Sequence, residues 1–366
     1  MPSLTERQRR FLDLVRMFSG VFVGRQYAAF AGITHGQKVH DFIERLLARG
    51  WVRPMALGPS GRVRLYHVHH KPLYAAIDDP DNRHRRTPAS GRAIERLMVL
   101  DGVIADRSVA WLGTEREKRA HFAAQSDLNL LDIQYPRLAF GQPPRQTVRY
   151  FPDKVPIGHD EYSQRYVFLY PVHAVDLAHF CLFLARHHWL LNSLPFWTIR
   201  VLCPRALMGH ARSFSWATQT TLASPLHLDQ LPELVWFFEV TSRGNASECQ
   251  RHAARLRAAR RMFRGPRFIA LRRLWHQLGE TALLVVNSHV LRDQMERGRG
   301  AVEIVESAHD YEYLRSLAGL KTSRRANRWG DEPRGTGVPL ATRHHGAAST
   351  APPPPTSSRA AGSKAL

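Results

Sequence analysis

The chain has 366 residues, more than one hydrophobic core usually serves, so we expect two folded domains and an appendage. Lysine and arginine number 52 against 31 aspartates and glutamates, which gives a net charge of +21 and a pI near 10.8. This charge favours a polyanionic partner, above all nucleic acid. A membrane surface would attract the same charge, but the sequence has no run of about 18 apolar residues and no signal-peptide pattern. We therefore expect a cytoplasmic protein that does not enter a membrane.

Cysteine and histidine usage argues against a metal centre. Cys181, Cys203 and Cys249 are too scattered for a disulfide framework or a zinc site, so free thiols are expected. The densest histidine clusters, at residues 67–70 and 187–188, have no cysteines at zinc-finger spacing. The clusters are therefore interpreted as ordinary surface and core histidines, and we expect no metal ion and no cofactor.

The N-terminal segment predicts three helices. Thr5 and Gln8 have the spacing of a capping box, which opens a first helix. Residues 23–51 predict two further helices separated by a tight turn at residues 32–34. Thr34 and Gln37 form a second capping box, so the last helix is expected to start at His35 and to stop at Gly50.

One face of this last helix is predicted to pack and the other to stay free. The apolar residues recur at helical spacing: Val39, Phe42, Ile43, Leu46 and Leu47. The polar residues fall on or beside the opposite side: Gln37, Lys38, Asp41 and Arg45. A short helix, a turn and a longer helix indicate a helix-turn-helix, whose second helix enters the DNA major groove.

A strand pair is predicted after the helices. Residues 58–61, Gly-Pro-Ser-Gly, are turn-forming and lie between strand-like segments. Arg62 and Arg64 alternate with apolar residues, so they share one strand face and could contact phosphates. The prediction for residues 1–77 is a winged helix-turn-helix. Winged helices also serve as protein-docking modules, but the basic wing and the overall charge favour DNA.

Residues 78–90 are polar, contain proline and lack an apolar period, which predicts a linker. Residues 91–320 then predict an α/β domain with a mixed sheet. Its predicted helices cover 94–104, 115–125, 177–191 and 206–218, and its predicted strands cover 109–112, 147–151, 166–172 and 197–203. The whole chain is thus assigned to the α+β or α/β class.

The C-terminal third gives weaker patterns. Residues 234–240, LVWFFEV, predict a further strand, residues 246–263 a strongly basic helix, and residues 283–286 a short apolar run. The arginines of the basic helix leave two interpretations open, a solvated helix or a surface that follows phosphates. Residues 321–366 have almost no aliphatic content and predict a disordered, basic, proline-rich tail.

The predicted order of elements resembles a known family. A winged helix ending in a tyrosine-containing strand (residues 65–68, LYHV), followed by an α/β domain with Pro152-Asp153 after an apolar strand, resembles the replication-relaxation family of plasmids and integrative elements. The resemblance covers about residues 5–218. It implies a winged helix joined to a domain related to PD-(D/E)XK nucleases.

The resemblance also implies which residues would carry nuclease chemistry. In PD-(D/E)XK nucleases an aspartate after proline and an acidic residue on the next strand hold a divalent cation, and a lysine two positions later orients or activates water. Asp153 matches the first position, but Tyr170 and Val172 occupy the other two. Lys154, Asp160 and Glu161 are possible substitutes, although they are predicted to lie in a turn.

A second alignment places Glu239 of the 234–240 strand as the acidic residue, with Thr241 at the lysine position. Both alignments leave the chemistry incomplete. We therefore expect a degenerate nuclease-like domain with no catalytic residues, and if the domain is active the candidates are Asp153, Lys154 and Glu239.

Three functions follow as hypotheses. The first is a protein of a mobile genetic element that binds double-stranded DNA, as a transcription regulator or as a replication or mobilisation accessory factor, and that could form a homodimer. Its predicted DNA contacts are Gln37, Lys38, Asp41, Arg45, Arg62 and Arg64. The second is a metal-dependent nuclease, which needs at least two carboxylates near Asp153. The third is a protein-interaction adaptor, which needs an acidic partner for the basic surface.

Overall fold

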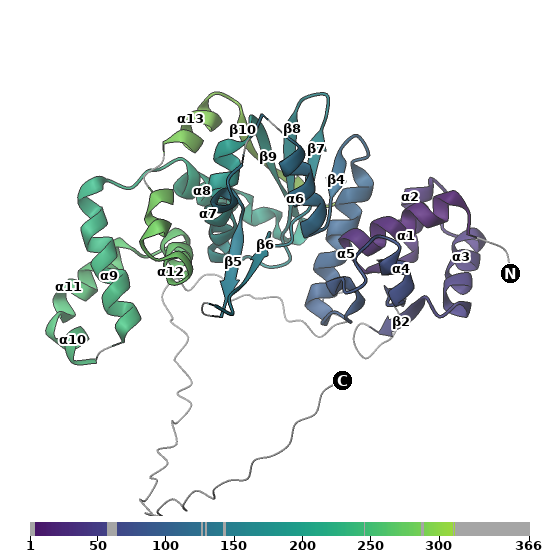
Figure 1. Cartoon of the computed structure of the whole chain (residues 1–366), viewed down its shortest axis with the longest axis horizontal. Helices are drawn as coiled ribbons and strands as arrows, with labels where there is room; N and C mark the ends of the chain where they lie inside the picture. The colour runs from purple at the N-terminus through teal and green to yellow at the C-terminus, as the bar shows by residue number, and fades with distance from the viewer. Residues whose placement is uncertain are drawn as a thin grey trace, which may run out of the picture. The chain divides into compact units, whose positions relative to one another are not determined.

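The computed structural model shows a mixed α and β fold with thirteen α-helices in its described part (Figure 1). It describes residues 4–56, 64–125, 127–128, 130–141, 144–244, 246–286, 289–309 and 311. These residues fall within one compact unit, Met1–Asn327. The predicted wing turn, Arg62 and the predicted tail at 321–366 lie outside the described residues.

The N-terminal part combines helices with a small antiparallel sheet. Its elements are α1 (Glu6–Phe18), β1 (Val21–Val23), α2 (Gly24–Ala31), α3 (Gln37–Ala48), β2 (Val52–Ala56), β3 (Arg64–Val68) and α4 (Lys71–Ala75). The strand order is β1-β3-β2, with β3 antiparallel to both neighbours. The capping box predicted at Thr5 and Gln8 is confirmed at the start of α1. Phe11 lies at the centre of the core, with its ring centroid 5.4 Å from Phe22 and 6.0 Å from Phe42. Such edge-to-face contacts add to the burial energy and hold α1, β1 and α3 together.

The turn between α2 and α3 is as predicted, but the start of α3 is not. Gly32 ends α2 in the left-handed conformation, with φ at +65°. α3 begins at Gln37 rather than His35, and its N-cap is Gly36, which makes no side-chain capping bond. The capping box predicted at Thr34 is therefore wrong. The Gln37 amide instead donates from Nε2 to Asp41 Oδ1, 2.6 Å away and one turn further along the same helix.

The segment predicted as a linker, residues 78–90, is packed against the N-terminal sheet. It contains the short 3₁₀-helix η1 (Arg83–Arg85), and His84 within it is buried. The His84 carbonyl oxygen lies 2.9 Å from Nε2 of His67 on β3. Gly20 has φ at +70°, and a Cβ there would lie 2.6 Å from the His84 backbone, so only glycine lets this segment approach so closely.

Helix α5 (Ser90–Ala105) packs against the three-stranded N-terminal sheet and against the larger, five-stranded sheet. Leu97 belongs to a buried cluster with the β1 residue Val21. Further along the same helix, a Cβ on Gly102 would lie 2.7 Å from Leu202 and 2.8 Å from Leu169 of the larger sheet. This close approach explains a glycine inside a helix, where it otherwise costs stability. Helix α5 therefore joins the N-terminal part to the α/β part through buried contacts.

A polar network strengthens this junction. Arg25 on α2 donates two hydrogen bonds to Asp101 on α5, at 2.9 and 2.8 Å. Gln26 donates to the same carboxylate over 2.9 Å, and the hydroxyl of buried Tyr311 is a fourth donor to it. Bidentate arginine–carboxylate geometry is among the stronger charge-assisted arrangements. Asp101 therefore links α2 and α5 to Tyr311, which lies beyond the last strand.

The α/β part contains a mixed sheet, as predicted, and this sheet has five strands. Its strands are β4 (Ala110–Leu112), β7 (Ile157–Asp160), β8 (Arg165–Pro171), β9 (Phe196–Cys203) and β10 (Gly300–Glu306), in the order β10-β9-β8-β7-β4. β8, β9 and β10 are parallel, and β7 is antiparallel to β8 and β4. Between β4 and β7 lie α6 (Glu115–Ala124) and the two-stranded sheet of β5 (Arg137–Phe140) and β6 (Thr147–Tyr150). Helix α7 (Leu177–Ser193) connects β8 to β9 and supplies much of the core.

A helical region follows β9 and corrects two predictions. Its helices are α8 (Ala211–Leu222), α9 (Leu231–Arg243), α10 (Ala246–Arg251), α11 (Ala253–Met262), α12 (Pro266–Leu278) and α13 (Val290–Glu296). The strand predicted at 234–240 is wrong, because these residues lie in α9, which has Pro232 in its first turn and ends at Gly244 with φ at +62°. The basic helix predicted at 246–263 is two helices, α10 and α11. Within the described residues, no helix is both long and apolar enough to cross a membrane.

Candidate functional site

The turn between β6 and β7 carries the predicted Pro-Asp pair and has an unusual backbone. Phe151 and Lys154 both have positive φ, +48° and +62°, although neither is glycine. Such conformations cost about 1 to 3 kcal/mol each and persist only where the surroundings impose them. Here the turn directs two opposite charges to different environments. The Asp153 side chain is 4% exposed, whereas Lys154 is exposed.

The buried Asp153 carboxylate is neutralised by an arginine. Arg186 of α7 donates from Nη1 to Asp153 Oδ1 over 2.5 Å, and its side chain is 7% exposed. His187 Nδ1 lies 3.8 Å from Oδ2, but burial lowers the pKa of His187 to about 4 despite the nearby carboxylate. His187 is therefore neutral at physiological pH, and the ion pair is between Asp153 and Arg186.

Tyr170 stands at the acidic position of the first alignment, and a phenol cannot replace a carboxylate ligand. Tyr170 Oη lies 2.9 Å from His179 Nδ1. Burial, and then the charge of Asp153, raise the pKa of Tyr170 well above its ordinary value, so the hydroxyl stays protonated. Among the residues described, no group of three or more histidine, cysteine or acidic side chains is placed to hold a metal ion.

The substitute carboxylates do not converge on Asp153. Glu239, proposed by the second alignment as a strand residue, lies on helix α9, where its carboxylate is 3.4 Å from Arg243 one turn away. That alignment is wrong, because its strand is a helix. Asp160 ends β7 and accepts hydrogen bonds from the Tyr162 backbone and the Ser163 hydroxyl in the following turn.

The predicted DNA contacts on α3 share an exposed polar face. Lys38 and Asp41 are exposed, opposite the buried Val39 and Phe42. Gln37 is held by its bond to Asp41, which leaves Lys38 as the freer donor on the first turn. Half-buried Arg45 donates from Nε to the Asp41 carbonyl oxygen over 2.9 Å. Its guanidinium is therefore turned back along the helix.

The predicted strand contacts are described only in part. Arg64 begins β3, is exposed and pairs in register with Ala56 of β2. Arg53 of β2 is also exposed, and its guanidinium donates to the Thr87 hydroxyl. Arg64 thus extends the polar surface of the N-terminal part beyond α3.

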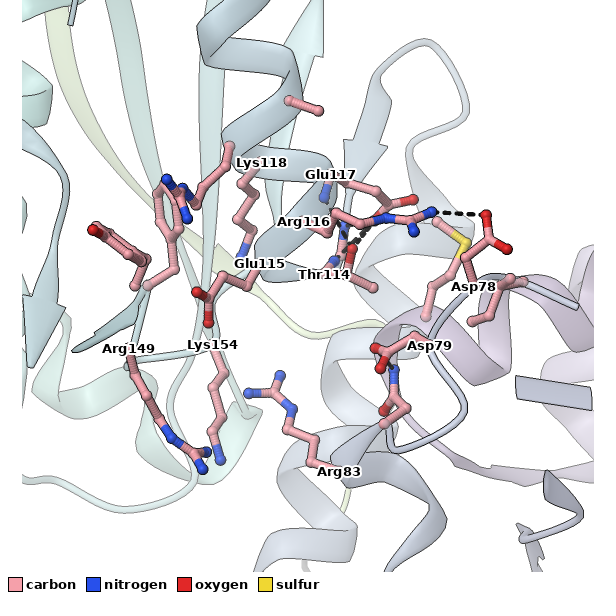
Figure 2. Close-up of a pocket in the computed structure, with 18 of the residues that line it drawn as sticks. Asp78, Asp79, Arg83, Thr114, Glu115, Arg116, Glu117, Lys118, Arg149 and Lys154 are labelled. Atoms are coloured by element: carbon pink, nitrogen blue, oxygen red, sulfur yellow. Dashed lines mark hydrogen bonds and ion pairs between the residues drawn. The ribbon is translucent and has the colours of Figure 1, made fainter. Parts of the chain in front are cut away.

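A cavity of about 800 Å³ lies beside the Asp153 turn (Figure 2). Its lining comes from η1 and the residues before it, from α6 and the residues that precede it, and from residues 149–152 and Lys154. Figure 2 shows Arg83, Arg149 and Lys154 directed toward the same part of this space. Lys154 therefore lines the cavity, whereas the carboxylate of the adjacent Asp153 is buried away from it.

Lys118 forms the buried floor of this region. It is 1% exposed, its Nζ donates to the Val155 carbonyl oxygen over 2.6 Å, and it lies 5.3 Å from the centroid of the Phe151 ring. Burial, and then the charge of Arg83, lower the pKa of Lys118 to about 7. A buried ammonium with one hydrogen bond is costly, and this cost is the main cause of the lowered pKa.

Sequence reasoning missed Arg186, Lys118 and Arg83. Arg186 had a usable signal, because the run ARHHW interrupts an otherwise apolar helix, and a buried arginine requires an acidic partner. Lys118 and Arg83 had no such signal in the sequence. They lie in polar, charged segments and become neighbours only when α6 and η1 pack.

Comparisons of the chain with family models, curated proteins and solved structures find no match.

Proposed function

We propose that this protein binds double-stranded DNA of a mobile genetic element and that its N-terminal part acts as a winged helix. The observation that carries the proposal is the two-sided character of α3. One side is buried in an aromatic core, and the other presents exposed Lys38 and Asp41, which within the described residues form no hydrogen bond or ion pair with a group outside α3. A helix held in this way can lie in a major groove.

The surroundings of α3 support this proposal. The helix follows a tight turn after α2, and it precedes the antiparallel pair β2 and β3, where Arg64 is exposed. An exposed arginine on such a strand pair can contact phosphates while the helix contacts base edges. The net charge of +21 supplies attraction for any duplex.

The α/β part would then serve as a support of the DNA-binding part, in line with the proposed kinship to degenerate PD-(D/E)XK domains. Two observations favour this role. Helix α5 packs against the N-terminal sheet and the five-stranded sheet, and Asp153 is committed to a buried ion pair with Arg186. A nuclease would need that carboxylate for a divalent cation, which would leave the Arg186 guanidinium buried without its counter-ion.

The test is selection of bound fragments from the source genome by the purified full chain, followed by affinity measurements on the enriched sequence. We expect Lys38→Ala and Asp41→Ala to change the preferred sequence, since a base-edge contact is worth about 1 to 3 kcal/mol. Arg64→Ala should weaken binding to all sequences and lower the salt dependence by about one phosphate.

Lys71→Ala is the matched control, because Lys71 is an exposed cation at the start of α4 and not on α3 or β3. Its preferred sequence should be that of the parent. The proposal fails if no fragment is enriched, or if the α3 variants select the same sequence with the same affinity as the parent. Assays with and without magnesium would also reveal strand cleavage, which would support the nuclease instead.

A further inference from the structure

We propose that the cavity beside the Asp153 turn is a binding site for a phosphate group, held by Arg83, Arg149 and Lys154. This inference does not depend on DNA binding by α3, because it concerns residues of η1, β6 and the turn after β6. Its observation is a cavity toward which three cations are directed (Figure 2).

The carboxylates that line the cavity are mostly engaged elsewhere. Asp78 pairs with Arg116 at 2.9 Å, and Asp79 accepts from the Asn82 amide at 2.8 Å. Glu117 accepts the backbone N–H groups of Gly113 and Thr114 at the start of α6, at 2.9 and 2.8 Å. These carboxylates therefore have their own partners, and within the described residues none of them forms an ion pair with Arg83, Arg149 or Lys154.

Asp81 and Glu115 complete the acidic lining. Asp81 pairs with Arg85 at 3.3 Å. Glu115 has no hydrogen-bond or ion-pair partner within the described residues, and its charge raises the pKa of Lys118, so it partly balances that buried ammonium. An anion in the cavity would be repelled by Glu115 and attracted by the cations.

The three cations lack acidic partners of their own. Within the described part of the chain, Arg83, Arg149 and Lys154 form no ion pair. Burial, and then the charges of Arg83, Arg92 and Arg96, lower the pKa of Lys154 to about 8, which shows that like charges crowd this side of the cavity. Like charges brought together by a fold favour an anion between them.

Phosphate is the anion that this arrangement suits. Arginine presents planar, forked donors that match phosphate oxygens, and lysine adds a compact charge. The volume of about 800 Å³ lies within the range of small-molecule sites, so a larger phosphorylated group fits. The aromatic rings of Tyr135, Tyr150 and Phe151 also line the cavity and offer apolar surface beyond the phosphate.

The experiment titrates the full-length protein with inorganic pyrophosphate in low salt and follows heat of binding. The variant is Arg149→Gln/Lys154→Gln, whose two side chains are exposed, so folding should be little affected. We expect its pyrophosphate affinity to fall by about tenfold or more, since each charge-assisted hydrogen bond contributes substantially.

Two further variants sharpen the result. Arg260→Gln/Arg261→Gln on α11 removes the same net charge from exposed positions outside the cavity and should bind pyrophosphate within about twofold of the parent. Glu115→Gln removes the carboxylate that has no partner and should tighten binding, an effect that a damaged fold would not produce. No pyrophosphate binding by the parent, equal losses in both double variants, or no tightening in Glu115→Gln would each overturn the proposal.

The source of the phosphate is distinguished by a second titration, of pyrophosphate into protein saturated with a duplex. If the site holds a DNA backbone phosphate, the duplex displaces pyrophosphate, and Arg149→Gln/Lys154→Gln weakens duplex binding with a smaller salt dependence. If the site holds a free phosphorylated molecule, the duplex leaves pyrophosphate affinity unchanged. Both outcomes retain the phosphate site, and the pyrophosphate titration without DNA can succeed even if the α3 proposal fails.

Discussion

The buried pair of Asp153 and Arg186 allows a direct test of whether Asp153 has a structural role. Both side chains are under 10% exposed and 2.5 Å apart, and they join the β6–β7 turn to helix α7. Asp153→Ala would leave the guanidinium buried without its counter-ion. Breaking such a pair costs about 3 to 5 kcal/mol. A domain typically has only about 5 to 15 kcal/mol of stability, so the loss should be obvious.

The assay is urea unfolding at pH 7.5, followed by tryptophan fluorescence. Asp153→Ala should lower the free energy of unfolding by about 3 to 5 kcal/mol, and Asp153→Asn, which keeps the shape but not the charge, should behave similarly. The double variant Asp153→Ala/Arg186→Met should recover most of the loss, because neither charge is left buried. Asp229→Ala, at an exposed site in η4 (Leu228–Gln230), is the control and should change stability by less than about 0.5 kcal/mol.

The reasoning is refuted if Asp153→Ala is as stable as the parent, or if the double variant is less stable than either single variant. A catalytic role would give a different pattern. Asp153→Ala would then abolish magnesium-dependent DNA cleavage while leaving the free energy of unfolding almost unchanged, because a metal-binding carboxylate is not needed to balance Arg186.

Further predictions concern pH, a packed glycine and the C-terminal tail. Burial lowers the pKa of His67, His187 and His188 to about 4, so below pH 6.5 these histidines bind protons in the unfolded chain but not in the folded chain. The free energy of unfolding should therefore be highest above pH 6.5 and fall by about 2 kcal/mol per histidine at pH 5. Urea unfolding across this pH range measures the change, and a flat profile would contradict it. Gly102→Ala should cost about 1 to 3 kcal/mol, because its Cβ would lie 2.7 Å from Leu202, whereas Gly209→Ala, with nothing near its Cβ, should not. Deleting residues 321–366, which the sequence predicts to be disordered, should leave the melting temperature unchanged, and a drop of several degrees would show that the tail docks.

The elements that the sequence predicted well have strong local signals. α1 has its capping box, and α7 has a long apolar pattern of 17 residues. The strand predicted at 234–240 was wrong because seven mostly apolar residues suit a buried strand and a buried helix equally. Only Pro232 and Gly244 mark the ends of the helix that these residues form.

The turn predicted at residues 157–160 was wrong for a different reason, because these residues form strand β7. Residues 157–160, IGHD, look like a turn, yet a Cβ on Gly158 would lie 2.1 Å from Val109, so the glycine marks a strand in close contact with its neighbour. Of the residues at the site, the sequence pointed only to Asp153 and Lys154. The counter-ion of Asp153, Arg186, is 33 residues away, and packing alone brings the two together.

The β6–β7 turn connects the two halves of the site through its backbone. A lysine directly after an aspartate would ordinarily be expected to share its environment, yet here Asp153 faces the core and Lys154 faces the cavity. The left-handed conformations at Phe151 and Lys154 make that separation possible. The buried ion pair of Asp153 with Arg186 stabilises the β6–β7 turn, and this turn determines where the charge of Lys154 lies. A loss of the Asp153 pair should therefore weaken anion binding in the cavity, although Asp153 itself does not line it. That coupling predicts that Asp153→Ala/Arg186→Met, although folded, binds pyrophosphate less tightly than the parent.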